Sequence, residues 1–400
     1  MNKKICVIGL GYIGLPTAAL LANRGYDVHG VDVTKSTVDI INQAKVHIAE
    51  PELDIYVKAA VNSGKLKADL KPTNADIFII AVPTPFYEGF IPNVDYIISA
   101  TKGIAPFVQE GNIIILESTS PIGTTNLVEQ TLKDENVDTS KLFFAYCPER
   151  VLPGNIMIEL VTNDRIVGGT TPEATQKIVK FYKTFVSGNV LSTDAKTAEM
   201  AKLTENSFRD VNIAFANELS ILCDKFDINV WNLIKLTNRH PRVNVLQPSA
   251  GVGGHCIAVD PWFIVHAGGG DAKIIKTARE VNTYKTEWAI EKIKNEALIF
   301  EKKNGRKAKV ACMGITFKPN IDDLRESRAI YIAKSLIAQG FDILVVEPNI
   351  KSHKEFDIVE CKEALEKADI VTFLVGHKEF KNLDIKTSLD FCGILNHFEK

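Results

Sequence analysis

Val7-Ile8-Gly9-Leu10-Gly11-Tyr12-Ile13-Gly14 decides the fold, because it joins an apolar run to a turn with regularly spaced glycines. Ile5–Leu10 reads as a buried strand, and the segment after the turn reads as a helix. In the spacing G-x-G-x-x-G, the first glycine permits a tight turn. The second lets a pyrophosphate approach the backbone, and the third lets helix and strand pack closely. The stretch therefore predicts a dinucleotide-binding unit.

An acidic residue stands where such a unit needs one. Asp32 lies at the end of the second predicted strand, about twenty residues after Gly9. A carboxylate there accepts hydrogen bonds from ribose hydroxyls and disfavours the 2′-phosphate of NADP. The free N–H groups at the helix start suit the phosphates. We therefore expect NAD⁺ as the cofactor, and a glycine turn in a cofactor-free α/β protein is the weaker alternative.

Apolar runs alternate with amphipathic segments over about the first 190 residues, which is typical of a parallel α/β sheet. Long helical patterns follow at Ala198–Phe226 and Ala272–Phe300, and the loop Asn238–Pro261 between them is rich in Gly and Pro. After Lys302–Lys307, which reads as a polar linker, the α/β alternation returns. The predicted strands are Ile5–Leu10, Asp27–Val33, Asp76–Val82, Asn112–Ser118 and Leu142–Tyr146, then Val310–Gly314, Asp342–Glu347 and Asp369–Val375.

This order predicts an α/β protein with two Rossmann-like, doubly wound parallel-sheet domains joined by a central helical domain. The expected boundaries are 1–192 for the NAD-binding domain, 193–300 for the helical domain and 301–400 for the C-terminal domain. The two ends of the chain echo each other. Ala-Asp-Ile leads a strand at 75–77 and again at 368–370, and the second strand of each part ends in an acid, Asp32 and Glu347.

Composition excludes several classes of protein. The 400 residues carry a formal net charge of −2, so no overall attraction to nucleic acid or to an anionic membrane is expected. No apolar run reaches the roughly 18 residues of a membrane span, and glycines interrupt the N-terminal apolar stretch, unlike a signal peptide. Seven cysteines without a CxxC pair favour reduced thiols and a cytoplasmic location. His240 and His255 lack carboxylates at metal-ligand spacing, so no metal is expected.

A glycine-rich loop with a cysteine is the leading candidate for chemistry. Within residues 251–261, Cys256 follows three glycines and precedes Asp260. Glycines let a ligand approach the backbone, and an exposed thiol there could attack an aldehyde. A buried apolar cysteine is an equally open alternative. Core positions are expected for Cys6, Cys223 and Cys312, which lie in apolar patterns.

Polar residues elsewhere fit anionic or nucleotide ligands. Lys202, Asn206 and Arg209 recur at i, i+4 and i+7, so one helical face would carry only hydrogen-bond donors, which suits an oxyanion or a phosphate. A solvated helix face is the plainer alternative. Glu149 follows a predicted strand and could act as a base, while hydroxyls at 82–85 and 118–125 could equally be ordinary turn residues. Two further candidates for contacts with such ligands are a basic loop at 238–242 and the strand-to-helix turn at 314–327.

Together these stretches resemble the UDP-glucose/GDP-mannose dehydrogenase family along nearly the whole chain. The resemblance rests on residues 7–18, 117–124, 147–154 (C-P-E-R-V-L-P-G), 201–218, 238–244, 251–262 (G-V-G-G-H-C-I-A-V-D-P-W) and 317–327 (F-K-P-N-I-D-D-L-R-E-S). It implies an enzyme that converts the C6 alcohol of a UDP-sugar to a carboxylate with two NAD⁺ and one water. Cys256 would form a thiohemiacetal and then a thioester. The resemblance also implies a homodimer packed through the long central helix.

The same resemblance assigns roles to single positions. Lys202 would be the acid/base, Asn206 would stabilise oxyanions with Lys202, and Asp260 would support the cysteine. The full catalytic set is Cys256, Lys202, Asn206, Glu149, Thr119 and Asp260, of which Glu149 and Thr119 would position water. The cofactor contacts are Gly9, Gly11, Tyr12, Ile13, Gly14, Asp32, Thr84, Thr125 and Arg325. The substrate contacts are Arg150, Val151, Lys202, Asn206, Arg209, His240, Arg242, Gly253, Phe317 and Lys318.

Two positions depart from relatives in the family. Pro153 stands where the UDP-glucose branch carries a second glutamate, which matches the acetamido-sugar branch and argues against UDP-glucose. Within that branch we expect a manno-configured sugar as the substrate, with its gluco epimer as the rival. A non-catalytic nucleotide-sugar-binding protein is the alternative from another class of protein. Cys392 stands where close relatives carry Lys, which puts one contact to a substrate phosphate or a partner subunit in question.

Overall fold

The computed structural model describes residues 3–254, 256–381, 383, 385 and 388–395. It divides into two compact units, one of residues 1–204 with 262–267 and the other of residues 205–261 with 268–400. The long helix α8 (Ala195–Lys225) contributes residues to both units. Among the described helices, none combines the length and apolarity needed to cross a membrane.

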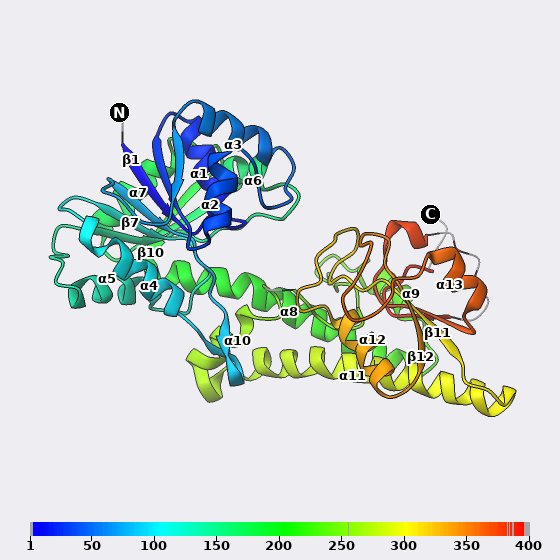
Figure 1. The fold of residues 1–400 in the computed structure, drawn as a ribbon. Coiled ribbons are helices and arrows are strands. Elements are labelled where there is room, and N and C mark those ends of the chain that lie inside the picture. The colour runs from blue at the N-terminus through cyan, green and yellow to red at the C-terminus, as the bar shows by residue number, and fades with distance from the viewer. Residues whose placement is uncertain (1–2, 255, 382, 384, 386–387, 396–400) are drawn as a thin grey trace. The chain divides into compact units, whose positions relative to one another are not determined.

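The N-terminal unit is built on an eight-stranded sheet in the order β10-β9-β8-β7-β4-β1-β2-β3 (Figure 1). Its strands are β1 (Lys4–Ile8), β2 (Asp27–Val31), β3 (Leu66–Asp69), β4 (Ile77–Ile80), β7 (Ile113–Leu116), β8 (Phe143–Tyr146), β9 (Arg165–Gly169) and β10 (Val190–Asp194). A small hairpin, β5 (Phe86–Tyr87) with β6 (Ile91–Pro92), lies in the loop after β4.

The sheet confirms the expected fold class and departs from a fully parallel sheet at one place. From β3 to β8 all neighbouring strands pair parallel, whereas β9 pairs antiparallel with β8. The helix between them, α6 (Ile156–Thr162), has only seven residues. Because the chain does not return to the amino edge before β9 begins, Arg165 starts that strand close to Glu149, which follows β8. This local reversal brings two charged side chains together.

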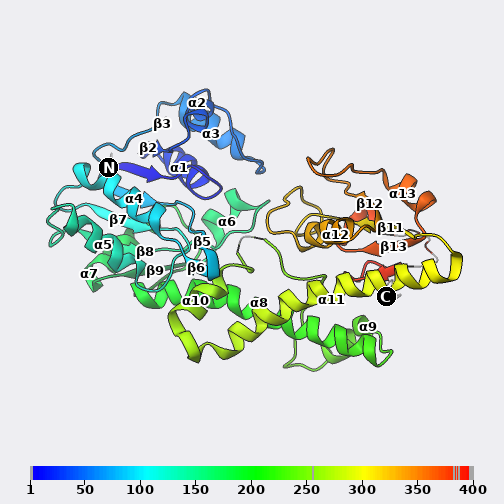
Figure 2. The same ribbon diagram turned by 60° about the horizontal axis from the view of Figure 1, so that its bottom comes forward.

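Helices cover both faces of this sheet, as a doubly wound fold requires. The helices α1 and α3 lie on one face, and α4 and α5 lie on the other (Figures 1 and 2). Apolar side chains from α1, α3, α6 and α7 build one core, and those from α4 and α5 build the other. The helices are α1 (Gly14–Asn23), α2 (Lys35–Asn42), α3 (Leu53–Asn62), α4 (Asp95–Ile104), α5 (Thr124–Asp134), α6 (Ile156–Thr162) and α7 (Pro172–Tyr182). Single 3-10 turns lie at η1 (Glu88–Phe90) and η2 (Ala105–Phe107).

In the second unit, long helices precede a smaller α/β domain. The helices are α9 (Val230–Thr237), α10 (Asp260–Gly268), which also reaches the first unit, η3 (Gly269–Asp271) and α11 (Lys273–Asn304). The predicted linker at 302–307 needs correction, because α11 continues through Asn304 and ends at Gly305, whose φ of 69° stops the helix. Exposed lysines favour the last helical turn, where they complement the helix dipole. A buried network of Asp210, Arg279 and Asn282 joins α8 to α11.

The C-terminal α/β domain has a four-stranded sheet in the order β12-β11-β13-β14, all of whose pairs are parallel. Its elements are β11 (Lys309–Met313), α12 (Arg328–Ala338), β12 (Asp342–Val346), α13 (Cys361–Lys367), β13 (Ile370–Phe373), η4 (Lys378–Phe380) and β14 (Ser388–Asp390). Side chains of α11 and α12 cover one face, and those of α13 and η4 cover the other. As predicted, Cys6, Cys223 and Cys312 are buried in the cores.

Candidate active site

The glycine turn after β1 has the shape that a dinucleotide needs. Gly9 has a φ of 93°, and a methyl group on Gly14 would lie 1.7 Å from the Gly9 carbonyl oxygen, so α1 packs directly on the turn. A methyl group on Gly11 would meet nothing within 4 Å. The turn is therefore closed on its protein side and open at Gly11, while Tyr12 and Ile13, which precede α1, are exposed and half-buried. These features fit a bound pyrophosphate.

The acid predicted to hold a ribose lies beside this turn. Asp32 follows β2, and its carboxylate accepts hydrogen bonds from the Leu10 N–H at 3.1 Å and the Thr34 N–H at 2.9 Å. The side chain is only half-buried, and each carboxylate oxygen keeps a lone pair for a hydroxyl donor. His47, which sequence reasoning missed, lies near enough that the Asp32 charge opposes the lowering of its pKa by burial. No spacing signal marks His47.

Hydroxyl side chains gather at the carboxyl edge of the sheet. The Thr84 hydroxyl, after β4, is buried and has no hydrogen-bond partner among the described residues, which leaves a donor for a ligand. Thr119, after β7, is half-buried. Thr125 is instead buried, and its hydroxyl and N–H both donate at 2.7 Å to the carboxylate of Glu199 from α8. Glu199 thus joins the start of α5 to α8, a role that its sequence position did not indicate.

The loop after β8 brings Glu149 and Lys202 together. Lys202 Nζ donates to the Glu149 carbonyl oxygen at 2.9 Å. The Glu149 carboxylate accepts the Arg150 N–H at 2.6 Å and forms an ion pair with Arg165 Nη1 at 2.7 Å, with both side chains buried. The Arg150 N–H and the Arg165 guanidinium thus hold the Glu149 carboxylate in one position.

Two further acids support this region, and neither was predicted. Glu117, at the end of β7, is 3% exposed and accepts the Tyr182 hydroxyl at 2.7 Å. Burial raises the pKa of Glu117 to about 7, against the opposing charge of Arg165. Glu50 is also buried and accepts the N–H groups of Gly154 and Ile156 at 2.9 and 2.8 Å, which fixes the loop that carries Arg150 and Val151. Buried acids look like exposed ones in a sequence, so no pattern could have identified them.

In the second unit, Cys256 lies in the loop that leads into α10. The residue is half-buried, and its carbonyl oxygen accepts the N–H groups of Val259 and Asp260 at 3.1 and 2.9 Å. Asp260 is buried and accepts a hydrogen bond from the Asn206 side-chain amide at 2.5 Å. Two residues of the predicted catalytic set, Asn206 and Asp260, are thus brought together, and Asp260 lies four residues after the cysteine in the chain. Cys256 is half-buried, whereas Cys6, Cys223 and Cys312 are buried.

The cysteine loop packs against the C-terminal α/β domain. A methyl group on Gly253 would lie 2.4 Å from the Glu326 carbonyl oxygen, and one on Gly254 would lie 3.0 Å from the Phe317 ring. Arg328 Nε donates to the Val252 carbonyl oxygen at 3.2 Å. The glycines therefore allow two loops of the second unit, both predicted from sequence to serve the site, to approach each other closely.

The other predicted ligand residues lie at the surface. Arg209, His240, Arg242 and Lys318 are exposed, and Arg150 Nη1 donates to the Asp164 carbonyl oxygen at 3.1 Å. Arg325 is paired with Asp323, with a shortest N–O distance of 2.6 Å. Cys392 is half-buried near Asp390, and burial raises the pKa of its thiol. Exposed cations on loops are suited to anionic groups such as diphosphates.

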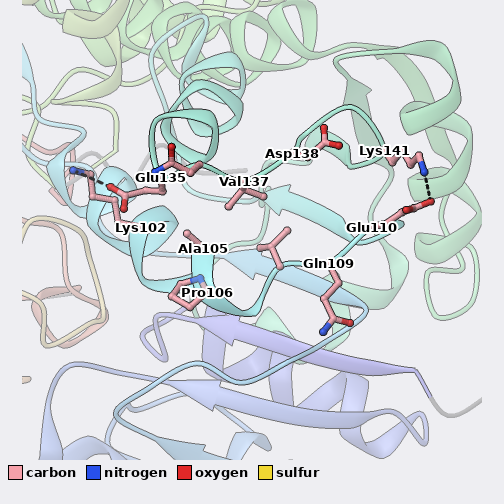
Figure 3. A pocket seen from close by; sticks show the side chains of 11 residues that line it. Lys102, Ala105, Pro106, Gln109, Glu110, Glu135, Val137, Asp138 and Lys141 are labelled. Atoms are coloured by element: carbon pink, nitrogen blue, oxygen red, sulfur yellow. Dashed lines mark ion pairs between the residues drawn. The ribbon is translucent and has the colours of Figure 1, made fainter.

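One surface pocket lies elsewhere. It is lined by the loop before β7, the end of α5 and the loop before β8, including Lys102, Glu135, Glu110 and Lys141 (Figure 3). Two ion pairs, Lys102–Glu135 and Lys141–Glu110, already join charged side chains there. The pocket belongs to the amino edge of the sheet, whereas ligands of doubly wound folds bind at the carboxyl edge. None of the predicted site residues lines it. Among the described residues, no group of three or more His, Cys, Asp or Glu could hold a metal ion.

A Rossmann domain with an open glycine turn and an acid after its second strand defines the class of NAD-dependent dehydrogenases. Comparison with known sequences narrows this class. The chain belongs to the UDP-glucose/GDP-mannose dehydrogenase family, because it matches the family's NAD binding domain over residues 3–186, its central domain over 196–284 and its UDP binding domain over 311–393. It is an NAD-dependent oxidoreductase with a UDP-binding domain.

Several relatives match nearly the full length. A UDP-N-acetyl-D-mannosamine dehydrogenase of Campylobacter jejuni is 54% identical over 98% of this chain and 100% of its own length. An NDP-N-acetyl-D-galactosaminuronic acid dehydrogenase of Ralstonia solanacearum is 51% identical, over 96% of this chain and 92% of its own. Among solved structures, a UDP-D-ManNAc dehydrogenase of Pyrococcus horikoshii superposes with a TM-score of 0.90 at 35% identity, covering 99% of this chain and 96% of that one.

Proposed function

We propose that the protein oxidises the C6 alcohol of UDP-N-acetyl-D-mannosamine to the carboxylate, giving UDP-N-acetyl-D-mannosaminuronate, with two NAD⁺ and one water. The observation that carries this proposal is the 54% identity, over the full length, to the Campylobacter jejuni enzyme of that name. Pro153 supports it, because this position separates the acetamido-sugar branch from the UDP-glucose branch.

In this reaction Cys256 is the covalent nucleophile. Bound NAD⁺ supplies the hydride acceptor for both oxidations. The Cys256 thiolate adds to the C6 aldehyde, and the carbonyl oxygen gains a proton to give a thiohemiacetal. Loss of a hydride and a proton then leaves a thioester, whose C–S bond water cleaves to release the acid and restore the thiol.

The other residues of the predicted catalytic set would supply charge and orientation. We assign removal of the alcohol proton to Lys202, which would accept it as the neutral amine and whose Nζ is held by a hydrogen bond to the Glu149 carbonyl oxygen. Asn206 has one amide N–H held by Asp260 and a second left to donate to the alkoxide and tetrahedral oxyanions. Glu149, fixed by Arg165, and Thr119 orient the hydrolytic water.

Binding roles follow the predicted positions. NAD⁺ would contact the turn Gly9–Gly14, including Tyr12 and Ile13, the carboxylate of Asp32, and the hydroxyls of Thr84 and Thr125, with Arg325 contributing from the C-terminal domain. For the UDP-sugar we propose contacts with Arg150, Val151, Lys202, Asn206, Arg209, His240, Arg242, Gly253, Phe317 and Lys318. These residues would belong to three domains, 1–192, 193–300 and 301–400.

We also propose that the enzyme is a cytoplasmic homodimer. Phe208, Phe215 and Leu222 recur every two turns of α8 and are 67, 54 and 42% exposed. A row of large apolar side chains on one helix is typical of a surface that packs against another protein. Light scattering of the purified protein tests the dimer, and a mass of one chain at micromolar concentration would refute it.

Turnover on a panel of nucleotide sugars tests the substrate. UDP-N-acetylmannosamine, UDP-N-acetylglucosamine, UDP-N-acetylgalactosamine and UDP-glucose would each be incubated with enzyme and NAD⁺, with NADH measured by absorbance and products by mass. We expect the manno sugar to give the highest kcat/KM and a uronic acid as product. If it yields no NADH while another sugar does, the proposed substrate is wrong although the family assignment stands.

The galacto sugar is the second candidate. The relative from Ralstonia solanacearum, named for N-acetyl-D-galactosaminuronic acid, is only slightly less similar than the one from Campylobacter jejuni. The gluco sugar remains in the panel as the C2 epimer of the first choice. A ranking of kcat/KM across the three acetamido sugars separates these possibilities.

A further inference from the structure

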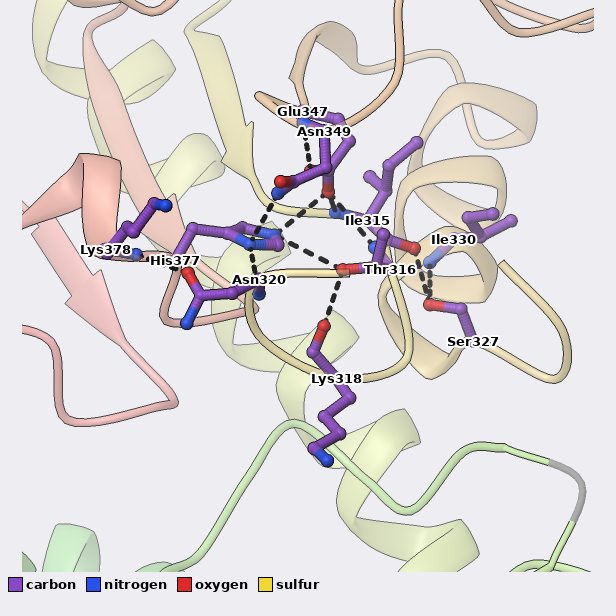
Figure 4. Close-up of polar contacts among 10 residues, drawn as sticks. All are labelled: Ile315, Thr316, Lys318, Asn320, Ser327, Ile330, Glu347, Asn349, His377 and Lys378. Carbon is purple, nitrogen blue, oxygen red and sulfur yellow. Dashed lines mark hydrogen bonds and ion pairs between the residues drawn. The ribbon is translucent and has the colours of Figure 1, made fainter. Parts of the chain in front are cut away.

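A buried histidine in the C-terminal α/β domain forms hydrogen bonds through both ring nitrogens. Its partners are the loop 316–320 and a carboxylate that contacts the same loop. His377 comes shortly after β13 and is fully buried, as is the side chain of Glu347, which follows β12 (Figure 4). The two lie across the turn that joins β11 to the loop 316–320. The predicted mechanism uses neither residue, and sequence patterns gave no reason to select His377.

Hydrogen bonds determine which ring nitrogen of His377 carries the proton. Nδ1 receives the Asn320 backbone N–H at 2.9 Å and lies 3.0 Å from the Asn349 amide nitrogen, so Nδ1 is an acceptor. Nε2 therefore carries hydrogen and donates to Glu347 Oε2 at 3.0 Å. Glu347 in turn accepts the N–H groups of Ile315 and Thr316 at 2.8 and 3.2 Å. The imidazole thus joins the two ends of the loop.

The loop 316–320 closes around this ring. Thr316 Oγ1 donates to the Lys318 carbonyl oxygen at 2.9 Å, and the Asn320 side chain accepts the Lys378 N–H at 2.9 Å (Figure 4). Asn320 has a φ of 60°, in the left-handed region that costs free energy for a residue with a side chain. A bond from its backbone N–H to a buried acceptor stabilises that conformation. Without His377, the loop loses its central support.

His377 matters for the site because the loop 316–320 carries two residues of the predicted substrate set. Phe317 and Lys318 are proposed to contact the UDP-sugar, and Phe317 also packs against Gly253 and Gly254 of the cysteine loop. A shift of Phe317 would therefore be felt at the backbone two residues before Cys256. The chain of contacts runs from His377 through the loop 316–320 to the cysteine loop, entirely within the second unit.

We propose that His377 is a positioning residue that holds the loop 316–320, and through Phe317 the cysteine loop, in the conformation that receives the UDP-sugar. The ligand named here rests on the proposed function. Any buried neutral histidine needs a partner for each ring nitrogen, but those partners need not belong to one loop. His377 instead accepts from a backbone N–H of the loop and donates to the carboxylate that holds the other end of the same loop.

Three variants and one control test the proposal. His377→Leu removes both polar contacts. His377→Asn keeps an acceptor near the position of Nδ1, and His377→Gln keeps a donor near that of Nε2. Val371→Ala, which truncates a buried side chain of β13 in the same domain, controls for lost stability, because it leaves the polar network intact. Two readouts are taken on each: hydrogen exchange of peptides spanning 314–328 and 251–254, and the Kd of UDP by calorimetry.

We expect His377→Leu to accelerate exchange in both peptides and to weaken UDP binding by about tenfold, with the KM for NAD⁺ unchanged. His377→Asn should recover more of the protection than His377→Gln, because it retains the acceptor for Asn320. Val371→Ala should lower the melting temperature without either change. Wild-type exchange and UDP affinity in His377→Leu would overturn the proposal. If wild-type protein fails to bind UDP, the proposed substrate class fails, while the exchange data still decide whether His377 holds the loop.

Discussion

The glycine turns at Gly9 and Gly314 occupy the same place in two sheets and make the same backbone contacts. Each glycine has a positive φ and donates its N–H at 2.8 Å to the last residue of the second strand, Val31 or Val346. The next N–H donates to the acid that follows that strand, Leu10 to Asp32 and Ile315 to Glu347. The two turns differ in what else reaches the acid.

Asp32 is half-buried and keeps lone pairs for a ligand, whereas Glu347 is buried beneath His377. Burial alone would raise the pKa of Glu347, but the hydrogen bonds from His377, Ile315 and Asn349 hold that pKa below its usual range. One turn thus leaves its acid available to a ribose, and the other uses its acid to fix a loop. The comparison teaches that the fold of a dinucleotide site can be kept while its ligand position is filled by protein.

The proposed mechanism places the covalent chemistry at Cys256, outside both turns, and the largest expected effect tests this proposal. Cys256→Ser should lower oxidation to the acid by about a thousandfold or more, because an alcohol is a poor nucleophile beside a thiolate. NAD⁺ and UDP binding, measured by calorimetry, should be unchanged. Cys361→Ser, at another half-buried cysteine, is the matched control and should keep full activity. Full conversion to the acid by Cys256→Ser would end the covalent mechanism.

Two alanine substitutions separate the two functions expected of the turn Gly9–Gly14, which are the approach of the cofactor and the packing of α1. Gly11→Ala places a methyl group in open space, so the protein should fold normally while the KM for NAD⁺ rises by about a hundredfold, since the pyrophosphate can no longer approach the backbone. Gly14→Ala places its methyl group 1.7 Å from the Gly9 carbonyl oxygen and should lower the melting temperature. Thermal unfolding and NAD⁺ titration measure both. Unaltered NAD⁺ binding in Gly11→Ala would place the cofactor elsewhere.

Replacing the acid of each turn, Asp32 or Glu347, tests whether the two turns differ in function. Asp32→Ala should raise the KM for NAD⁺ by about tenfold, through the loss of ribose hydrogen bonds, and leave UDP binding intact. Glu347→Gln should leave the KM for NAD⁺ unchanged and lower the protection of 314–328 from hydrogen exchange. Initial rates at varied NAD⁺ provide the measurement. If both variants changed the KM for NAD⁺ by the same factor, the two turns would not differ in function.

The last effects concern stability rather than activity, and they have opposite signs in the two units. Burial raises the pKa of Glu117 to about 7 and lowers that of Lys285 to about 7. Folding therefore loses stability as pH rises from about 4.5 to 7 because of Glu117, by roughly 3 kcal/mol at most, and gains it from about 7 to 10.5 because of Lys285, by roughly 5 kcal/mol at most. Glu117→Gln should reduce the fall in the free energy of unfolding across the lower pH range, and Lys285→Met should reduce its rise across the higher range. Urea unfolding at a series of pH values measures both changes. A variant whose pH dependence equals that of the wild type would contradict the prediction.

Most of the fold could be predicted because its strands are short apolar runs separated by turns. The expected strands at 5–10, 27–33 and 76–82 overlap β1, β2 and β4, and the helix expected at 198–226 overlaps α8. The edge strand β10 and its neighbour β9 escaped prediction. Arg165 begins β9 with a buried charge, and β10 is largely exposed, so neither shows a strand pattern. Lys302 and Lys303 looked like a linker because exposed helical ends and loops share a composition.

The site was less predictable than the fold, for a physical reason. Glycine spacing and the cysteine loop are local signals, and they led to the predictions for Gly9–Gly14 and Cys256. Glu50, Glu117, Glu199 and His377 act through partners that are distant in the chain, such as Tyr182 for Glu117 and Asn320 for His377. A buried acid or histidine has no distinguishing local pattern, so only the three-dimensional contacts reveal these residues. Glu149 was proposed from the sequence, but its ion-pair partner Arg165 was not.

The number of NADH molecules formed per sugar tests the central claim most directly. UDP-N-acetylmannosamine would be the limiting reagent, with excess NAD⁺, and the reaction would run to completion with the product identified by mass. The account predicts two NADH for each sugar consumed and a uronic acid as the product. One NADH for each sugar, with an aldehyde as the product, would contradict it.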